Sequence, residues 1–432
     1  MLSTAPYKGV RDFFPDDLKI RNYIFATWRK VCASFGFEEY DGPFLEPLEL
    51  FASKSGEELV NEQLYSFTDR GDRKVAIRPE MTPTVSRMAA EKISQNAPIP
   101  LKWFSIANFY RYEKPQKGRG REFFQLNVDI FGEESVYADL EILLLNDAIM
   151  TAFGAKPNMY QIKVNNRYLV DFLFENIVQV TGETKKKLSR YIDKKSKMTN
   201  EEFKKMLLSL GLSEDQITKV YTVLDYKLED LEKITYLPEK AKMLPQLLRL
   251  AQNSNVKGVV YDPTIIRGLD YYDGNVFEQF DLTQGNTRSM FGGGRYDGLI
   301  SLFMDKKVPA VGFAPGDITF TDFLKAWNLL PDLTSETTTL ITMFPGNEAC
   351  IKASYNIAAK LRKVCPVETY LNTETELTKQ IKYADRKGYA FVVIIGPDEM
   401  QSNSMTLKDL KNRTQQKVDK VTELAALITH AK

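Results

Sequence analysis

The feature that most constrains how this chain folds is a change of hydrophobic period along its length. Between about residues 63 and 132, short runs rich in aromatic and β-branched residues alternate partially with polar ones, which predicts strands. Tight or charged connections join these runs and favour an antiparallel sheet over repeated βαβ units. From about 166 to 253 the apolar residues recur at helical spacing, with an N-cap available at Thr199 or Asn200. A helical insertion is therefore expected inside a sheet domain.

Beyond a linker-like stretch, "LLPDLTSETTT", strand-like and helix-like segments alternate to the end of the chain. That order predicts a separate α/β domain. The whole chain has 432 residues, of which 43% are hydrophobic, so more than one core is expected. We predict an α+β domain with a mixed, mainly antiparallel sheet over residues 1–327, including the helical insertion at about 166–253. A linker over 328–335 and an α/β domain over 336–432 follow.

Histidine use restricts the chemistry. The only histidine is His430, near the end of the chain. Histidine metal sites and Ser-His-Asp or Cys-His nucleophile systems are thereby nearly excluded. An enzyme built from this chain must work with arginines, carboxylates, backbone dipoles or a bound ion.

Charge and cysteine content restrict the cellular compartment and the kinds of partner that we expect. The 58 basic and 57 acidic residues nearly cancel, which argues against coating nucleic acid by bulk charge but allows a basic stripe. Three cysteines, far apart in the sequence, fit a reducing compartment and give no zinc pattern. No apolar segment is long enough to cross a bilayer, and the start of the chain lacks an apolar signal core. A cytoplasmic protein that makes no membrane contact is expected.

Residues 109–132, "FYRYEKPQKGRGREFFQLNVDIFG", predict two strands flanking a basic loop. Arg111 falls inside the first expected strand, where an arginine is costly unless it is paired. A phosphate or carboxylate would suit its planar guanidinium group. A solvated hairpin with a charged turn is the alternative.

Three further segments carry candidate chemistry. In "PTIIRGLDYYDGNVFE", Tyr271 and Tyr272 are adjacent, so on a strand only one of them should line a given pocket; an ordinary hairpin is the alternative. In "FGGGRYDGLI" the glycines indicate backbone packed against a ligand or a strand, or simply a flexible turn. In "AIRPEMTPT", Glu80 could hold an ammonium group or merely begin a helix.

Taken together and in order, these segments resemble histidyl-tRNA synthetases, which belong to class II of the aminoacyl-tRNA synthetases. "FGFEEYDGPFLEPLELF" looks like motif 1, the dimer element, and "RYEKPQKGRGREFFQLNVDIFG" looks like motif 2. "RGLDYYDGNVFE" and "GGGRYDGLI" are similar to the two histidine-specific segments. The last domain, with "QIKYADRKGYAFVVIIGPDE", resembles an anticodon-binding domain.

The resemblance implies a ligase that activates L-histidine with ATP and Mg²⁺ and charges tRNA(His), acting as a homodimer. Arg111 would bind the α-phosphate, and Arg267 would stabilise the pentacoordinate phosphorus. The positions matched to histidine are Glu80, Met81, Thr82, Gln125, Asp129, Arg267, Tyr271, Tyr272 and Tyr296. The positions matched to ATP are Arg111, Glu113, Arg119 and Arg267, and those matched to the tRNA acceptor end are Gln116 and Lys117. The resemblance implies no certain side-chain metal site.

Three positions depart from the family pattern. Thr319 stands where motif 3 usually has an arginine that clamps ATP, Asp129 replaces a glutamate, and Met81 replaces a glycine. One alternative function follows from the first departure: a regulatory relative that binds histidine and controls ATP phosphoribosyltransferase without charging tRNA. A plain RNA-binding or scaffold protein would leave the polar pocket residues unexplained.

Overall fold

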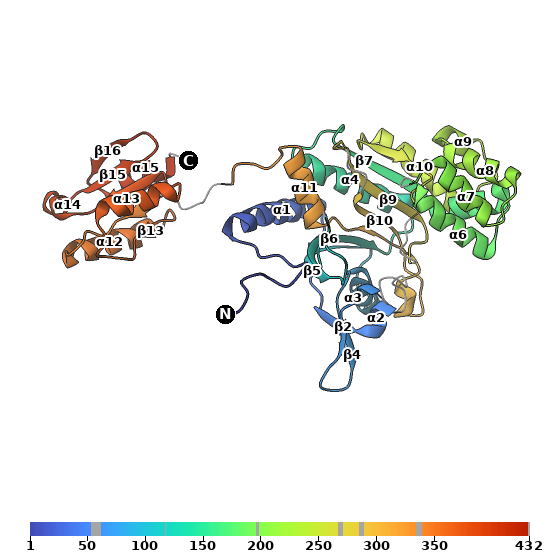
Figure 1. Cartoon of the computed structure of the whole chain (residues 1–432), viewed down its shortest axis with the longest axis horizontal. Helices are drawn as coiled ribbons and strands as arrows, with labels where there is room; N and C mark the ends of the chain where they lie inside the picture. The colour runs from blue at the N-terminus through green and yellow to red at the C-terminus, as the bar shows by residue number, and fades with distance from the viewer. Residues whose placement is uncertain are drawn as a thin grey trace. The chain divides into compact units, whose positions relative to one another are not determined.

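The computed structural model describes residues 1–52, 62–116, 118–195, 198–266, 271–284, 289–333 and 339–430. The chain divides into two compact units, Met1–Pro331 and Asp332–Lys432 (Figure 1). The first is an α+β unit with a helical insertion, and the second is an α/β unit. The predicted fold class is confirmed.

An eight-stranded sheet forms the centre of the first unit, in the order β1-β5-β6-β11-β10-β9-β7-β8. β1 pairs in parallel with β5 and β7 with β8, while all other neighbours are antiparallel. The sheet is therefore mixed and mainly antiparallel, as predicted. Its strands are β1 (Glu38–Glu39), β5 (Leu101–Tyr110), β6 (Glu122–Phe131), β7 (Tyr160–Asn166), β8 (Val259–Tyr261), β9 (Asn275–Asp281), β10 (Ser289–Arg295) and β11 (Ala310–Phe313).

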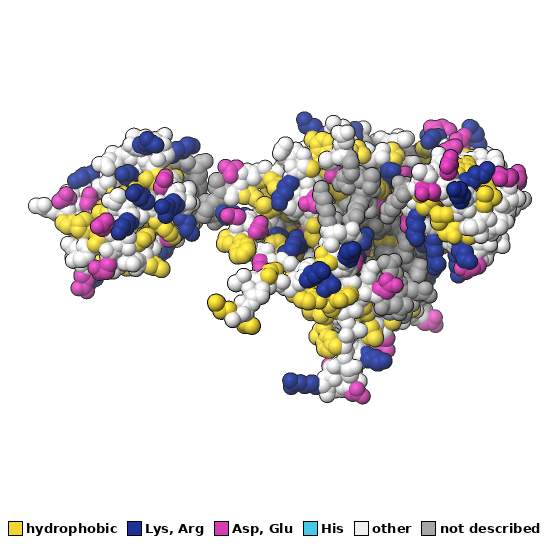
Figure 2. All heavy atoms as spheres, viewed as in Figure 1, with side chains coloured by type: hydrophobic (Ala, Val, Ile, Leu, Met, Phe, Trp, Pro, Cys, Tyr) yellow, Lys and Arg dark blue, Asp and Glu magenta, His cyan; other side chains and the backbone are white. Residues whose placement is uncertain are grey.

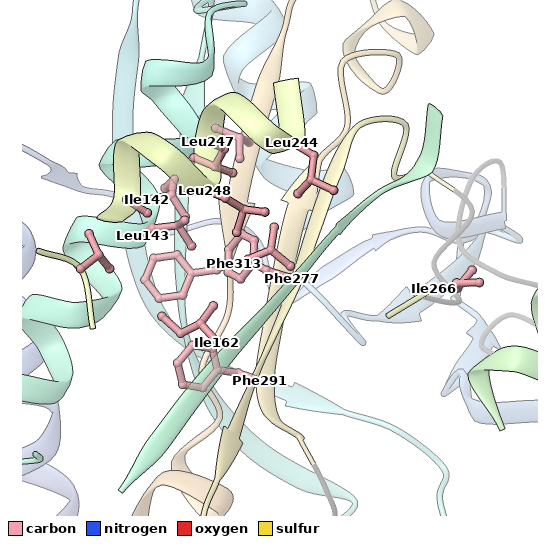
Figure 3. Packing of buried hydrophobic residues seen from close by; sticks show 14 of the residues in the cluster. Ile142, Leu143, Ile162, Leu244, Leu247, Leu248, Ile266, Phe277, Phe291 and Phe313 are labelled. Atoms are coloured by element: carbon pink, nitrogen blue, oxygen red, sulfur yellow. The ribbon is translucent and has the colours of Figure 1, made fainter. Parts of the chain in front are cut away.

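Helices α1 (Pro15–Ser34), α4 (Val136–Ala152) and α11 (Asp317–Ala326) contribute to the main apolar core against one face of this sheet. α1 begins with a proline at its first turn and two aspartates, which suit the positive end of a helix dipole. It ends at Ser34, and Gly36 then takes a positive φ of 75° that favours glycine. Figure 3 shows part of this core, where Phe277 and Phe313 of the sheet lie beneath Leu248 of α10 (Glu239–Asn253).

The helical insertion forms the connection between the adjacent parallel strands β7 and β8. Thr199 is the N-cap of α7, and its hydroxyl forms a capping box with Glu202. The elements of the insertion lie between Arg167 and Asn253. They are α5 (Arg167–Phe172), the π-helix η2 (Leu173–Val178), α6 (Gly182–Asp193), α7 (Asn200–Ser209), α8 (Glu214–Asp225), α9 (Leu228–Glu232) and α10.

A small antiparallel sheet, β2-β4-β3, stands apart from the main one. It consists of β2 (Leu45–Pro47), β3 (Ser66–Thr68) and β4 (Lys74–Ile77), and it is accompanied by α2 (Leu48–Ala52), α3 (Thr82–Ser94) and the 3-10 helix η4 (Ile300–Leu302). Phe44, Leu45 and Phe67 are exposed here, and Figure 2 shows hydrophobic side chains gathered over this part of the surface.

The second unit has a five-stranded sheet in the order β13-β12-β14-β15-β16. Its elements are β12 (Thr339–Ile341), α12 (Glu348–Leu361), β13 (Glu368–Thr369), α13 (Leu377–Arg386), β14 (Phe391–Ile394), α14 (Pro397–Ser402), β15 (Met405–Asp409), β16 (Thr414–Val418) and α15 (Val421–His430). β12 pairs in parallel with β13 and β14, and β14 to β16 run antiparallel. The short helix α14 was not predicted, and the predicted alternation of strands and helices ends at β15 and β16, which form a hairpin.

Candidate active site

The site lies on the face of the main sheet opposite the helical core. Because side chains alternate along β6, Phe123, Gln125 and Asp129 point to this face, while Leu126 and Val128 enter the core. Asp129 is opposite Gly312 of β11. A Cβ at Gly312 would lie 2.2 Å from the Asp129 Oδ1 atom. The glycine therefore leaves room for the carboxylate.

Three tyrosines form a buried aromatic wall beside Asp129. The ring centroids of Tyr271 and Tyr272 are 4.9 Å apart, and those of Tyr271 and Tyr296 are 5.9 Å apart. Both adjacent tyrosines thus belong to one cluster, so the expectation that only one of them could was wrong. The reason is local: β9 begins at Asn275, and the pair precedes the strand instead of alternating within it.

The tyrosine hydroxyls connect two carboxylates at separate positions in the pocket. Tyr271 donates to Glu80 Oε2 at 2.8 Å and lies 3.4 Å from Thr82 Oγ1. Tyr296 donates to Asp129. Glu80 precedes α3 and is only 5% exposed. Residues from four separated segments of the chain therefore meet in one buried polar cluster.

Electrostatics distinguish Asp129 from an ordinary carboxylate. Burial raises the pKa of Asp129 to about 7, and the hydrogen bond from Tyr296 opposes that change. Burial also raises the pKa of Tyr271 and of Tyr296 well above their usual value, with nearby carboxylates adding to the effect. Asp129 can thus take either protonation state near neutral pH, while both hydroxyls keep their protons.

Arg111 lies immediately beyond β5, which ends at Tyr110, and not inside the strand as expected. Its Nε donates to the Pro79 carbonyl at 2.9 Å, and its guanidinium lies 5.1 Å from the Phe123 ring centroid. Among the residues that the structure describes, no carboxylate forms an ion pair with Arg111. Since Pro79 directly precedes Glu80, the guanidinium is held near the Glu80 end of the pocket with capacity for an anion.

The loop after Arg111 is a tight hairpin. Gln116 and Arg119 exchange backbone hydrogen bonds of 3.1 and 2.9 Å, and Arg119 Nη1 lies 3.3 Å from Glu113 Oε2. Tyr7 and Gly9 hold the base of the loop: the Tyr7 hydroxyl accepts from Arg121 at 2.7 Å, and the Gly9 carbonyl accepts from the Arg121 amide at 2.6 Å. The N-terminal segment therefore positions this loop.

Thr319 stabilises the contact between α11 and β10. Its hydroxyl donates to the Met290 carbonyl at 2.9 Å. A Cβ at Gly118 would lie 3.4 Å from Thr319 Cγ2, so the basic loop packs over the position where the family's arginine is expected. Beside it, Asp317 accepts from Arg11 at 2.7 Å and from the Phe124 amide at 2.9 Å, which joins the N-terminal segment, β6 and α11.

Met81 is fully buried within the same apolar cluster as the three tyrosines. Arg267 and Lys117 fall outside the described residues, so their assignments remain predictions.

The glycine run of 292–294 belongs to the central strand β10, where a Cβ at Gly293 would lie 2.2 Å from the Gly312 carbonyl. Close strand packing, one of the alternatives, explains it. Arg295, at the end of this strand, was not assigned a role from sequence. It is buried, and its Nη2 lies 2.7 Å from Asp139 Oδ2, which ties β10 to α4. An arginine inside an apolar strand was the available signal.

Comparison with known proteins decides the family. A sequence model described as histidyl-tRNA synthetase matches residues 9–316, and one described as an anticodon-binding domain matches residues 339–429. The chain is 41% identical to a histidine–tRNA ligase of Leptospira biflexa over 96% of this chain and 95% of that protein. This chain belongs to the histidyl-tRNA synthetase family.

Solved structures of the family agree with the fold. A histidyl-tRNA synthetase from Nostoc superposes with a TM-score of 0.83 at 22% identity, covering 100% of both chains. A Bacillus halodurans protein titled as an ATP phosphoribosyltransferase regulatory subunit/histidyl-tRNA synthetase has a TM-score of 0.74 at 22% identity and covers 91% of this chain and 98% of its own. At this identity, both comparisons establish the fold alone.

Proposed function

We propose that this protein is a histidine–tRNA ligase that forms histidyl-adenylate from L-histidine and ATP and then charges tRNA(His). One observation carries the proposal beyond family membership. Two buried carboxylates, Glu80 and Asp129, each accept from a tyrosine hydroxyl, and the rings of those tyrosines, Tyr271 and Tyr296, pack against each other. The amino group and the imidazole of histidine need acceptors at two separate places, which this arrangement supplies.

The residue roles are part of the proposal. Glu80 and Thr82 accept from the α-amino group, and Gln125 contacts the substrate. Asp129 and the tyrosines recognise the imidazole ring. Arg111 lies near the Glu80 end of the pocket, because its Nε binds the carbonyl of the preceding residue, Pro79. It is therefore suited to bind an α-phosphate beside the substrate carboxylate.

In the first step, a carboxylate oxygen of histidine attacks the α-phosphorus of ATP, and the bond to pyrophosphate breaks. No side-chain nucleophile is needed, since catalysis consists of positioning and neutralisation of charge. Arg111, Arg267 and Arg119 supply positive charge, and Glu113 holds Arg119 by an ion pair. In the second step the terminal ribose hydroxyl of tRNA attacks the histidyl carbonyl, and AMP leaves. Gln116 and Lys117 lie in the loop that would meet the acceptor end.

Mg²⁺ is proposed as the partner of ATP, where it neutralises phosphate charge when bound. The part of the chain that the structure describes contains no cluster of three His, Cys, Asp or Glu side chains placed to hold a metal ion. An ion held mostly by nucleotide phosphates is compatible with this set of residues. Glu113 would supply a carboxylate from the loop.

The assembly and location are also proposals. The exposed apolar side chains of Phe44 and Leu45, in the segment similar to motif 1, support a homodimer. The second unit would bind the anticodon region of the tRNA, with affinity that falls as salt rises. No helix in the described ranges is both long and apolar enough to cross a membrane. Charging of tRNA would place the protein in the cytoplasm.

Histidine-dependent exchange of pyrophosphate into ATP tests the proposal, followed by charging of tRNA(His). Exchange with histidine and with no other amino acid is expected. Histidine binding without exchange would instead favour the regulatory relative. The match to an anticodon-binding domain over residues 339–429 argues against that alternative.

A further inference from the structure

Two hydroxyl groups near Asp129 have no role in the site as described so far. Tyr40 follows β1; its amide donates to the Phe104 carbonyl at 2.8 Å, and its ring centroid is 5.8 Å from that of Trp103. Trp103 is directly opposite Asp129 in the β5–β6 hairpin. Ser105 is two residues further along β5, so its side chain points to the same face as Trp103.

Both hydroxyl oxygens are buried, and among the described residues neither has a hydrogen-bond partner outside this pair. Ser105 as a whole is only 1% exposed. Burial raises the pKa of Tyr40 well above its usual value, the Asp129 carboxylate raises it further, and a hydrogen bond from the Ser105 hydroxyl lowers it. Tyr40 also raises the pKa of Tyr296. The three hydroxyls and the carboxylate are therefore near neighbours.

Two tyrosine hydroxyls of the site already donate their protons to carboxylates. Tyr271 donates its proton to Glu80, and Tyr296 donates its proton to Asp129. A neutral imidazole offers one N–H donor and one bare nitrogen that accepts. An ionised Asp129 can accept from the N–H but cannot donate to the bare nitrogen. Because Ser105 donates to the Tyr40 oxygen, the proton of the Tyr40 hydroxyl is available to a ligand.

A buried hydroxyl without a partner is costly, and most such groups in folded proteins meet a partner or an ordered water. Here the partner is missing beside a carboxylate that is one methylene shorter than the glutamate usual in the family. A shorter side chain leaves more space between the sheet and the substrate ring. The side-chain hydroxyls of Tyr40 and Ser105 can occupy part of that space.

We infer that Tyr40 is a specificity-determining residue for the histidine ring, and that its hydroxyl donates to the imidazole nitrogen that carries no hydrogen while Asp129 accepts from the other. Ser105 acts as a positioning residue, because its hydroxyl donates to the Tyr40 oxygen and leaves the Tyr40 proton for the ring. This inference rests on the proposed function. It also gives the segment similar to motif 1 a direct part in selecting the amino acid, because Tyr40 belongs to that segment.

The test uses the full-length protein with Tyr40→Phe and Ser105→Ala, which remove the hydroxyl groups and little else. In histidine-dependent pyrophosphate exchange, each variant should raise the KM for histidine about threefold to tenfold, as expected for one lost hydrogen bond. The KM for ATP and the kcat should stay within about twofold of wild type, because the hydroxyls do not contact the reacting phosphorus.

A second measurement separates recognition from structure. β-(2-Thienyl)alanine has a ring of similar size with no nitrogen, so it leaves polar groups of the pocket unpaired and should be strongly rejected by the wild type. The ratio of kcat/KM for histidine to that for thienylalanine should fall in both variants. Ser354→Ala is a matched control: it removes a buried hydroxyl that likewise lacks a partner, but in the second unit. That variant should keep the wild-type KM and ratio.

The outcomes are distinguishable. Wild-type protein that shows no histidine-dependent exchange would overturn the proposed function and the inference with it. Active wild type with unchanged histidine KM and unchanged discrimination in both variants would overturn the inference alone. Equal rises in the KM for histidine and for ATP, or a lowered melting temperature with discrimination intact, would show a structural role and would also overturn it.

Discussion

Replacing Asp129 by asparagine should flatten the pH dependence of the stability of the first unit. Burial raises the pKa of Asp129 to about 7, from about 4 in an unfolded chain. The folded state therefore binds this proton more tightly than the unfolded chain does. Its contribution to stability is fully present below about pH 4 and is lost as the pH rises through about 7. A difference of about three pKa units corresponds to about 4 kcal/mol in the free energy of unfolding.

Tryptophan fluorescence reports this unit selectively, because all three tryptophans, Trp28, Trp103 and Trp327, lie within it. Urea unfolding of wild type and Asp129→Asn would be compared from pH 5 to pH 8. Between pH 5 and pH 7, the stability of wild type relative to the variant should fall by about 2 to 3 kcal/mol. The asparagine oxygen can still accept from the Tyr296 hydroxyl, so the comparison isolates ionisation.

An exposed carboxylate provides the control. Asp322 is exposed on α11 in the same unit, and Asp322→Asn should give a pH profile parallel to that of wild type. Parallel profiles for wild type and Asp129→Asn would refute the reasoning, because they would mean that Asp129 titrates alike in the folded and unfolded states.

Three further substitutions test other parts of the site. Arg111→Ala should slow pyrophosphate exchange about 10²- to 10³-fold, because a donor to the charge that develops in the transition state is lost. Calorimetry should find the affinity for histidine within about threefold of wild type. A loss of histidine affinity as large as the loss of rate would contradict the phosphate role. Arg295→Met breaks the buried pair with Asp139 and should cost about 3 to 5 kcal/mol in urea unfolding, whereas a cost below about 1 kcal/mol would mean that the pair is not structural. Gly312→Ala places a Cβ 2.2 Å from Asp129 Oδ1, so the carboxylate must move. The KM for histidine should therefore rise, while the KM for ATP should not. Unchanged values for both substrates would contradict the close packing of Gly312 against Asp129.

Local features of the fold were predictable because they depend on neighbouring residues. The period of apolar residues predicted the helical insertion, and the local sequence offered Thr199 or Asn200 as an N-cap, of which the structure uses Thr199. The alternation of strands and helices predicted the α/β architecture of the second unit. Interpreting Tyr271 and Tyr272 as strand residues failed because the start of β9 at Asn275 depends on pairing with β7 and β10.

The candidate site was predictable only in part. Similarity to family motifs pointed to Glu80, Asp129 and the tyrosines, which the fold brings together. Nothing local marked Arg11, whose partner Asp317 is 306 residues away in the chain. The position of the basic loop over Thr319 depends likewise on how the β5–β6 hairpin meets α11.

The sequence by itself determined the residue types available for chemistry: a single histidine outside the site, arginines in a hairpin loop, and carboxylates and tyrosines in apolar segments. Only the tertiary structure decided which of these groups meet, such as Tyr271 with Glu80 and Tyr296 with Asp129. The physical reason is that propensity and period act over a few residues, whereas the contents of a pocket follow from strand order and register across the sheet.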